Sequence, residues 1–266
     1  MSGLNPLSAQ PYSWLKRHEP NPAARLRLLC FPYAGAGANA YRLWPKHIDK
    51  RIEVIGVQMP GREARLREPC AGNAEAVITN VIDELMRYCP RQPLAIFGHS
   101  MGSMLAYELA WRLKERHDWA PRALVVSGRL PPHVIFGGDL HQQTDEVLIE
   151  AVKRLNGTPA GVFEDDEMRR LILPVLRSDY QLVETYRVPP DGRLDCPVAV
   201  CTSTDDADAP PDEMVQWQSL TRGAFDRWDF KGDHFFLREQ AAQIAAVLNP
   251  YLMAVSRSHE VGERVY

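Results

Sequence analysis

The stretch FGHSMGSM (residues 97–104) contains the pattern G-x-S-x-G around Ser100. This pattern is typical of a nucleophile elbow, a sharp turn between a strand and a helix that presents a reactive serine. The pattern alone decides little, because a chain of 266 residues matches it by chance about one time in ten. The neighbouring sequence therefore has to show whether a strand precedes Ser100 and a helix follows it.

The residues on both sides of the motif fit that setting. PLAIFG (93–98) is a short apolar run of strand length, and MGSMLAYELAWRLKERH (101–117) places apolar side chains along one helical stripe. Gly98 and Gly102 leave room for a sharp turn with a strained central residue. The predicted helix would direct its free N–H groups and positive dipole end toward an anion formed at Ser100.

Strand and helix patterns alternate along the rest of the chain. Five further short runs are strand candidates: RLRLLCF (25–31), IEVIGVQM (52–59), ALVVSG (123–128), PVAVCT (197–202) and AFDRWDF (224–230). Most are apolar runs that suit strands buried on both faces of a parallel sheet. Helical patterns occupy residues 73–88, 144–155, 165–186 and 238–252. This alternation predicts an α/β fold in a single domain over residues 1–266, with an irregular lead-in over 1–24 and a frayed polar tail over 255–266.

One connection is much longer than the others. Residues 129–196 separate the fourth predicted strand from the fifth, and they contain two of the helical patterns, with Pro174 expected to kink the second. Such a segment is too long for a plain connection. We expect residues 131–190 to form a helical lid over the carboxyl ends of the strands, where open α/β sheets bind ligands.

Composition argues against several classes of protein. The net charge is −3 and no long basic run occurs, which disfavours a nucleic-acid role. No apolar run reaches the roughly 18 residues that a membrane-spanning helix needs, and the N-terminal residues lack the layout of a signal peptide. The five scattered cysteines form no C-x-x-C pair, so we expect reduced thiols in a cytoplasmic protein and neither a disulfide framework nor a zinc site.

A serine hydroxyl needs a base that takes its proton. Of the eight histidines, His234 lies in FKGDHFFL (230–237), after the last predicted strand and before the last helix. In the α/β-hydrolase order the histidine is the final member of the triad, so this position fits. His99 is next to Ser100 in sequence, but its side chain is expected to point away across the turn. We therefore predict His234 as the base.

The third member should be a carboxylate after the fifth strand. The segment CTSTDDADAPPDE (201–213) offers Asp205, Asp206 and Asp208. With Asp206 as the acid, the chain has the Ser…Asp…His order of α/β-hydrolases. The other acidic residues suit a solvated loop, and a calcium loop fits less well because the glycine at its sixth position is missing.

Two N–H groups should stabilise the oxyanion. One is expected from Met101, directly after the nucleophile, and the other from Ala34 in the glycine-rich loop FPYAGAGANAYRLWP (31–45). That loop is not G-x-G-x-x-G and lacks a Walker lysine, which disfavours a phosphate-binding role. We expect no cofactor and no metal.

Several motifs in order resemble the type II (external) thioesterases that accompany polyketide synthases and nonribosomal peptide synthetases. These motifs are FPYAGAGANAYRLWP, QMPGREARL, FGHSMGSMLAYELA, VSGRLPPH, LPVLRSDYQLVETY, the acidic loop leading to WQSLT, and GDHFFL. The resemblance runs from about Leu26 to Leu252. It implies an α/β-hydrolase fold with a lid, and hydrolysis of acyl groups misloaded on the phosphopantetheine arm of acyl or peptidyl carrier domains.

By position, the resemblance assigns the triad to Ser100, Asp206 and His234. The distance to Trp217 favours Asp206, but the loop lacks the glycine and proline of the family pattern, so Asp205 stays the alternative. Tyr33 stands where the family often has histidine. A small-molecule carboxylesterase or an acyltransferase would use the same triad, whereas a non-catalytic binding protein on this fold should lack one of its members.

Overall fold

One mostly parallel sheet forms the centre of the structure, a computed structural model that describes residues 13–134, 137–158, 161–189 and 192–257. Its seven strands, in the order β1-β3-β2-β4-β5-β6-β7, are β1 (Leu15–Arg17), β2 (Leu26–Phe31), β3 (Ile52–Val57), β4 (Leu94–His99), β5 (Ala123–Ser127), β6 (Val198–Ser203) and β7 (Phe225–Phe230). All neighbouring pairs are parallel except β1 with β3. The six strands expected from the sequence are confirmed.

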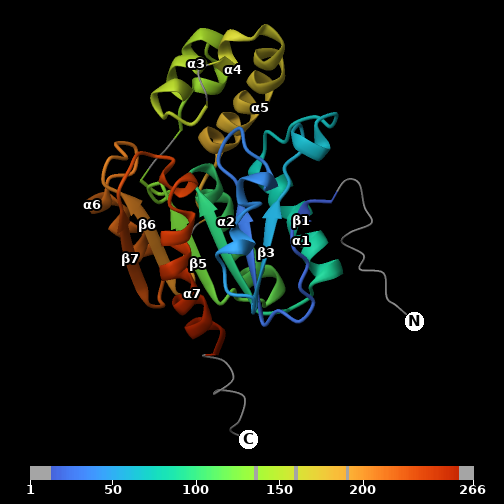
Figure 1. Cartoon of the computed structure of the whole chain (residues 1–266), viewed down its shortest axis with the longest axis vertical. Helices are drawn as coiled ribbons and strands as arrows, with labels where there is room; N and C mark the ends of the chain where they lie inside the picture. Colours follow the sequence, from blue (N-terminus) through green and yellow to red (C-terminus); the bar gives the residue numbers. More distant parts are fainter. Residues whose placement is uncertain (1–12, 135–136, 159–160, 190–191, 258–266) are drawn as a thin grey trace, which may run out of the picture.

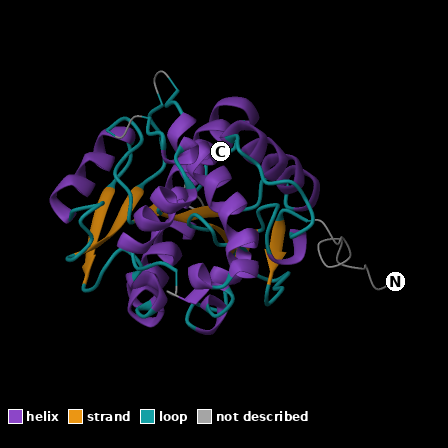
Figure 2. Cartoon of the chain, turned by 90° about the horizontal axis from the view of Figure 1, so that it is seen from above, coloured by secondary structure: helices purple, strands orange, loops and turns teal. Residues whose placement is uncertain are grey.

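Helices flank this sheet and cover its upper edge (Figures 1 and 2). They are α1 (Ala74–Tyr88), α2 (Met101–His117), α3 (Asp145–Arg154), α4 (Gly161–Glu164), α5 (Asp166–Thr185), α6 (Pro211–Met214) and α7 (Ala241–Arg257). The expected helices are confirmed to within a few residues, while the one-turn helices α4 and α6 were not predicted. Pro174 lies inside α5, which continues past it.

The expectation of an irregular lead-in over residues 1–24 was wrong for β1, and residues 1–12 of that span lie outside the described part of the chain. Leu15 pairs with Val57 at the antiparallel edge of the sheet. The Glu84 carboxylate accepts a hydrogen bond from the Trp14 N–H at 2.7 Å. A strand of three residues is too short to show a periodic pattern, so tertiary contacts and not local sequence create it. Residues 255–257 complete α7, and the rest of the expected tail lies outside the described residues.

The buried strands explain why the apolar runs are continuous. Along β2, Leu29 and Phe31 pack on the face that α1 and α2 cover. Leu28 and Cys30 pack on the opposite face with α7. Because successive side chains of a strand point to opposite faces, both positions of the alternation must be apolar. The strands β2 to β6 are therefore buried on both faces, whereas most residues of the edge strand β7 are half-buried or exposed.

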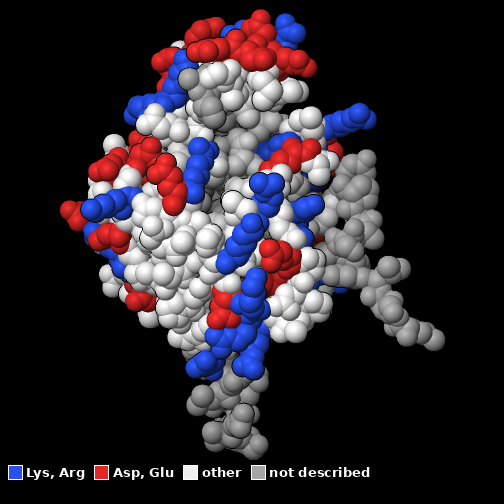
Figure 3. All heavy atoms as spheres, in the orientation of Figure 1, with Lys and Arg blue, Asp and Glu red and all other residues white. Residues whose placement is uncertain are grey.

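The helices α3, α4 and α5, which belong to the segment 131–190, lie above the carboxyl ends of the strands (Figure 1). They share a small core of their own that includes Leu148, Phe163 and Leu173. Acidic side chains gather on their outer surface (Figure 3), among them the exposed residues 164–167. The outer side of this helical insertion is thus charged and solvated, whereas its inner side is apolar.

Candidate active site

Ser100 occupies the single residue between β4 and α2. Its backbone has φ 54° and ψ −120°, a conformation that is strained for a residue with a side chain. A Cβ atom at Gly98 would lie 2.1 Å from the carbonyl oxygen of Gly102, and one at Gly102 would lie 2.2 Å from that of Phe31. Both glycines of the motif are therefore required by close backbone packing, and the turn between them holds Ser100 in its strained conformation.

Buried hydrogen bonds fix this turn from below. The Ser100 N–H donates to the Ser127 carbonyl at 2.8 Å, and the Ser103 hydroxyl lies 2.8 Å from the same carbonyl and 2.9 Å from that of Gly98. The His99 Nδ1 atom contacts the Ser127 hydroxyl at 2.9 Å. The His99 ring also packs against the rings of His234 and Phe235, with 5.2 and 5.9 Å between ring centres. Its burial lowers the imidazole pKa well below the usual value, so the ring is neutral.

His234 and Asp206 meet at the ends of two neighbouring strands. The Nδ1 atom of His234 lies 2.8 Å from Oδ2 of Asp206, and both side chains are buried. Two backbone hydrogen bonds align the loop after β6 with the loop after β7. The Thr204 N–H donates to the Phe230 carbonyl at 3.0 Å, and the Asp205 N–H donates to the Gly232 carbonyl at 3.1 Å. Strand pairing therefore continues just far enough to bring the two side chains together.

The other two aspartates of this loop have different surroundings. Asp205 is exposed and only its backbone joins the network described above. Asp208 is also exposed and forms an ion pair with Arg154 at 3.2 Å. Of the three candidate residues, the structure brings only Asp206 into contact with His234.

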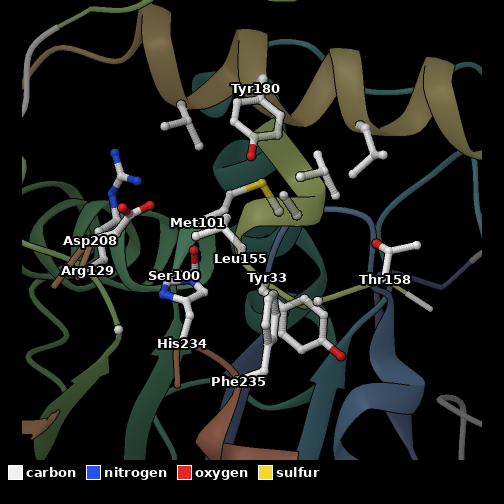
Figure 4. Close-up of a pocket in the computed structure, with 16 residues that line it drawn as sticks. Tyr33, Ser100, Met101, Arg129, Leu155, Thr158, Tyr180, Asp208, His234 and Phe235 are labelled. Carbon is white, nitrogen blue, oxygen red and sulfur yellow. The ribbon is translucent and has the colours of Figure 1, made fainter. Parts of the chain in front are cut away.

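The second ring nitrogen of His234 faces the site without a partner. A carboxylate can only accept, so the Nδ1 atom beside Asp206 carries the proton in the neutral ring and Nε2 keeps a free lone pair. This Nε2 atom is buried and makes no hydrogen bond to any described residue. Ser100 and His234 line the same pocket (Figure 4), but no hydrogen bond joins them. Such a bond often forms only once substrate is bound.

The pocket above Ser100 has a volume of about 280 Å³. Leu155, Leu176, Tyr180 and Val183 of the helical insertion line it. Tyr180 lies on the side of the insertion, and the rings of Tyr33 and Phe235 lie on the opposite side (Figure 4). Its lining is mainly apolar, so it suits a short acyl chain whose reacting end reaches Ser100.

Arg129, which follows β5, adds a positive charge to this pocket. Its Nε atom has no hydrogen-bond partner within the described ranges. Burial lowers its pKa to about 10, so the guanidinium stays charged at neutral pH. The Asp208 carboxylate lines the same pocket, so the pocket holds one positive and one negative side chain beside Ser100.

The two backbone groups expected to form the oxyanion hole line this pocket as well. Met101 is the first residue of α2, so its N–H has no partner inside the helix. Ala34 lies in the loop after β2 and also contacts the pocket. No described residue accepts a hydrogen bond from the Ala34 N–H. Both donors therefore stand free beside Ser100.

Sequence reasoning missed several residues of this site. Arg129 and Tyr180 line the pocket, and Asp179 joins the glycine-rich loop to α5. Their motifs, VSGRLPPH and LPVLRSDYQLVETY, had carried the family resemblance without a role for these side chains.

In the part of the chain that the structure describes, no group of three or more His, Cys, Asp or Glu residues is arranged to hold a metal ion. No helix there has the length and apolar character needed to cross a bilayer.

Comparison with known proteins identifies the family. A model of the thioesterase domain family matches residues 26–252. The "Probable cadicidin biosynthesis thioesterase" of Streptomyces griseus is 39% identical over 241 residues, which cover 89% of this chain and 66% of that protein. This chain thus spans about two thirds of the length of that relative. "Thioesterase PikA5" of Streptomyces venezuelae is 35% identical over 248 residues, covering 93% of this chain and 88% of that protein.

The solved structures agree. The type II thioesterase BorB from the borrelidin biosynthetic cluster superposes with a TM-score of 0.80 at 36% identity, over 90% of this chain and 97% of that one. The parallel sheet with its flanking helices is therefore the α/β-hydrolase fold, and the chain belongs to the thioesterase family, whose members are hydrolases that act on thioesters.

Proposed function

We propose that this enzyme removes acyl groups from the phosphopantetheine arm of acyl or peptidyl carrier domains in polyketide or nonribosomal peptide synthesis. The observation that carries the proposal is the buried contact of His234 with Asp206 at the floor of the pocket that Ser100 also lines. The names of the relatives support the biosynthetic setting, since they include thioesterases of antibiotic pathways.

The reaction begins with Ser100. Its Oγ attacks the thioester carbonyl while the free Nε2 atom of His234 takes the hydroxyl proton. Asp206 keeps the proton of His234 on Nδ1 and stabilises the imidazolium that forms. The carbonyl oxygen becomes negatively charged and accepts hydrogen bonds from the N–H groups of Ala34 and Met101, each worth roughly 3–4 kcal/mol in comparable enzymes.

The intermediate then collapses in two stages. The carbon–sulfur bond breaks and the leaving thiolate takes the proton from Nε2 of His234, which leaves an acyl ester on Ser100. A water molecule next gives a proton to the same nitrogen and attacks this ester. The free carboxylic acid leaves, and the proton returns to Oγ of Ser100.

The dimensions of the pocket support an editing role. A volume of about 280 Å³ with apolar walls accommodates a short acyl group, and an extended biosynthetic intermediate would need more space. Release of short acyl groups that block a carrier arm is the chemistry of editing. No metal or cofactor takes part in the proposed reaction.

A cytoplasmic setting belongs to the same proposal. All five cysteines are free, and Cys30, Cys89, Cys196 and Cys201 are buried. Free thiols suit the reducing conditions in which such synthases work.

The direct test compares the same acetyl group on three carriers: a phosphopantetheinylated carrier protein, coenzyme A and p-nitrophenol. We expect kcat/KM to be highest for the carrier protein. Equal values for carrier protein and coenzyme A would remove the carrier-domain part of the proposal, and preference for the oxygen ester would identify an esterase. Transfer of the acetyl group to an added alcohol or amine in place of water would identify an acyltransferase.

A further inference from the structure

A buried ion pair joins the helical insertion to the loop beside the active site. Arg62 and Asp179 form two parallel contacts, from Nη1 to Oδ2 at 2.5 Å and from Nη2 to Oδ1 at 2.8 Å. Arg62 follows β3 in the PGR segment, whereas Asp179 comes from α5. The Asp179 side chain is fully buried. Burial by itself would lower the pKa of Arg62, but nearby acidic groups, the Asp179 carboxylate foremost, together raise it.

The same two side chains hold the loop that contains Ala34. The Gly35 N–H donates to Asp179 Oδ2 at 2.8 Å, and Arg62 Nη1 donates to the Ala36 carbonyl at 3.2 Å. The ion pair therefore holds the backbone at Gly35 and Ala36, the two residues that follow Ala34.

The two contacts hold a tight turn in the backbone of this loop. The Ala36 N–H donates to the Tyr33 carbonyl at 3.0 Å, which closes a four-residue turn with Ala34 and Gly35 at its centre. Gly35 has φ +80°, the value of the third position in a type II turn. Type I and type II turns differ by a flip of the central peptide. The central peptide here joins Ala34 to Gly35, so a flip would reverse the Ala34 carbonyl and the Gly35 N–H together. The bond from the Gly35 N–H to Asp179 opposes that flip and fixes the backbone directly after Ala34.

We propose that Asp179 and Arg62 are positioning residues for the oxyanion hole, which hold the turn at the two residues after Ala34 and so keep the Ala34 N–H in its place beside the pocket. Because Asp179 lies on α5, the helical insertion completes the oxyanion hole as well as covering the pocket. This inference rests on the proposed roles of Ser100 and Ala34.

The test uses Asp179→Asn. Asparagine keeps the size of the side chain but removes the charge that holds Arg62. The contacts that fix the turn at Gly35 and Ala36 therefore weaken. We expect kcat for a simple acyl thioester to fall about 10- to 100-fold, with KM changed by less than about threefold. An alkylboronic acid, which bonds to Ser100 and places an oxygen in the oxyanion hole, should bind more weakly by about the factor lost in kcat/KM.

Glu108→Gln is the matched control. Glu108 and Arg112 form another buried ion pair, with 2.6 Å between Oε1 and Nε, within α2 and away from the turn. This variant should lose thermal stability but retain kcat and boronate affinity. Arg62→Lys is the second variant in case Asp179→Asn does not fold. It keeps the charge but cannot contact both Asp179 oxygens and Ala36, so it should weaken kcat and boronate binding together.

The readouts separate positioning from general destabilisation. Each variant is assayed at a temperature where circular dichroism shows it to be folded. Unchanged kcat and unchanged boronate affinity in folded Asp179→Asn or Arg62→Lys would overturn the inference, and so would a loss of kcat with unchanged boronate affinity. The substrate is acetyl-N-acetylcysteamine, a small thioester, so a failure of carrier-protein preference leaves this test intact.

Discussion

His234 and Asp206 are 28 positions apart in the chain, yet Nδ1 of the one lies 2.8 Å from Oδ2 of the other. Both side chains are buried, and each follows the carboxyl end of a strand at the same edge of the sheet. The contact fixes which nitrogen of His234 carries the proton and leaves the other nitrogen free to act as a base. It is therefore the relationship on which the proposed acid–base chemistry depends.

The first prediction concerns the identity of the acid. Asp206→Asn preserves the shape of the side chain but favours the wrong tautomer of His234. We expect kcat to fall by about 10²- to 10⁴-fold. The upper end of this range is the loss that the same change causes in a serine protease. Steady-state hydrolysis of one acyl thioester measures the effect.

Asp205→Asn and Asp208→Asn are the controls for this change. Asp205 is exposed, so its variant should keep activity within about threefold, as is usual for surface substitutions. Asp208 lines the pocket and pairs with Arg154 but does not contact His234, so its variant should lose far less activity than Asp206→Asn. A collapse of activity in Asp205→Asn, with Asp206→Asn active, would show that the acid is assigned one residue too late.

The second prediction concerns acyl chain length. Leu155 lines the pocket from the helical insertion, and Leu155→Ala would open space there. We expect the ratio of kcat/KM for hexanoyl to that for acetyl thioester to rise about tenfold, the lower range for methylene-sized changes in an apolar pocket. Val147→Ala serves as control because Val147 is exposed on α3. A ratio that stays constant would mean that the acyl chain does not extend toward Leu155.

The third prediction concerns stability at low pH. Burial lowers the pKa of His99 well below its usual value, and the nearby His234 contributes in the same direction. The folded state thus keeps this ring neutral, while the unfolded chain binds a proton below about pH 6.5. The unfolded state then binds more protons, so the free energy of unfolding decreases as the pH falls below that value.

His99 should contribute up to about 1.4 kcal/mol per pH unit to this decrease. Urea unfolding at pH 7.5 and 5.5 measures it. His99→Gln should flatten the dependence by that amount, whereas His47→Gln, at an exposed position, should not. An identical slope in His99→Gln and the parent protein would mean that His99 is protonated in the folded state.

The fourth prediction concerns the elbow. Gly102→Ala would place a Cβ atom 2.2 Å from the Phe31 carbonyl oxygen, and rigid backbone cannot relieve that overlap. We expect a loss of stability of at least about 3 kcal/mol, the upper range for overpacking, or failure to fold. At Gly161, the first residue of α4, an added Cβ meets nothing within 4 Å, so Gly161→Ala should be neutral or slightly stabilising. Thermal melts that coincide for Gly102→Ala and the parent would contradict the tight turn.

Much of the fold could be predicted because its signals are local. The apolar run from Leu26 to Phe31 is continuous because both faces of the strand are buried, and the Asn73 side chain caps the start of α1 by accepting a hydrogen bond from the Ala76 N–H. The strand β1 could not be predicted in this way. Three residues carry no periodicity, and contacts with Glu84 and β3 hold them in place.

The candidate site likewise combines features with a local sequence signal and features that depend on contacts between distant segments. The strand, turn and helix around Ser100 are contiguous in sequence, so the elbow could be predicted from the spacing of glycines. The choice among three aspartates depends on how two loops align across β6 and β7, which is a relation between distant segments. The pairing of Arg62 with Asp179 spans 117 positions, and no local pattern in either motif indicates the partner of the other.

The central claim, that Ser100 forms an acyl-enzyme, is tested most directly by rapid mixing with an acetyl-carrier protein, an acid quench, and mass spectrometry of the intact protein and of its proteolytic peptides. The account predicts a single added acetyl group on the peptide that contains Ser100, formed within the time of one turnover. It also predicts that Ser100→Ala has neither the adduct nor hydrolysis, with an unchanged circular dichroism spectrum. Near-normal turnover by folded Ser100→Ala, or an adduct on another residue, would contradict the account.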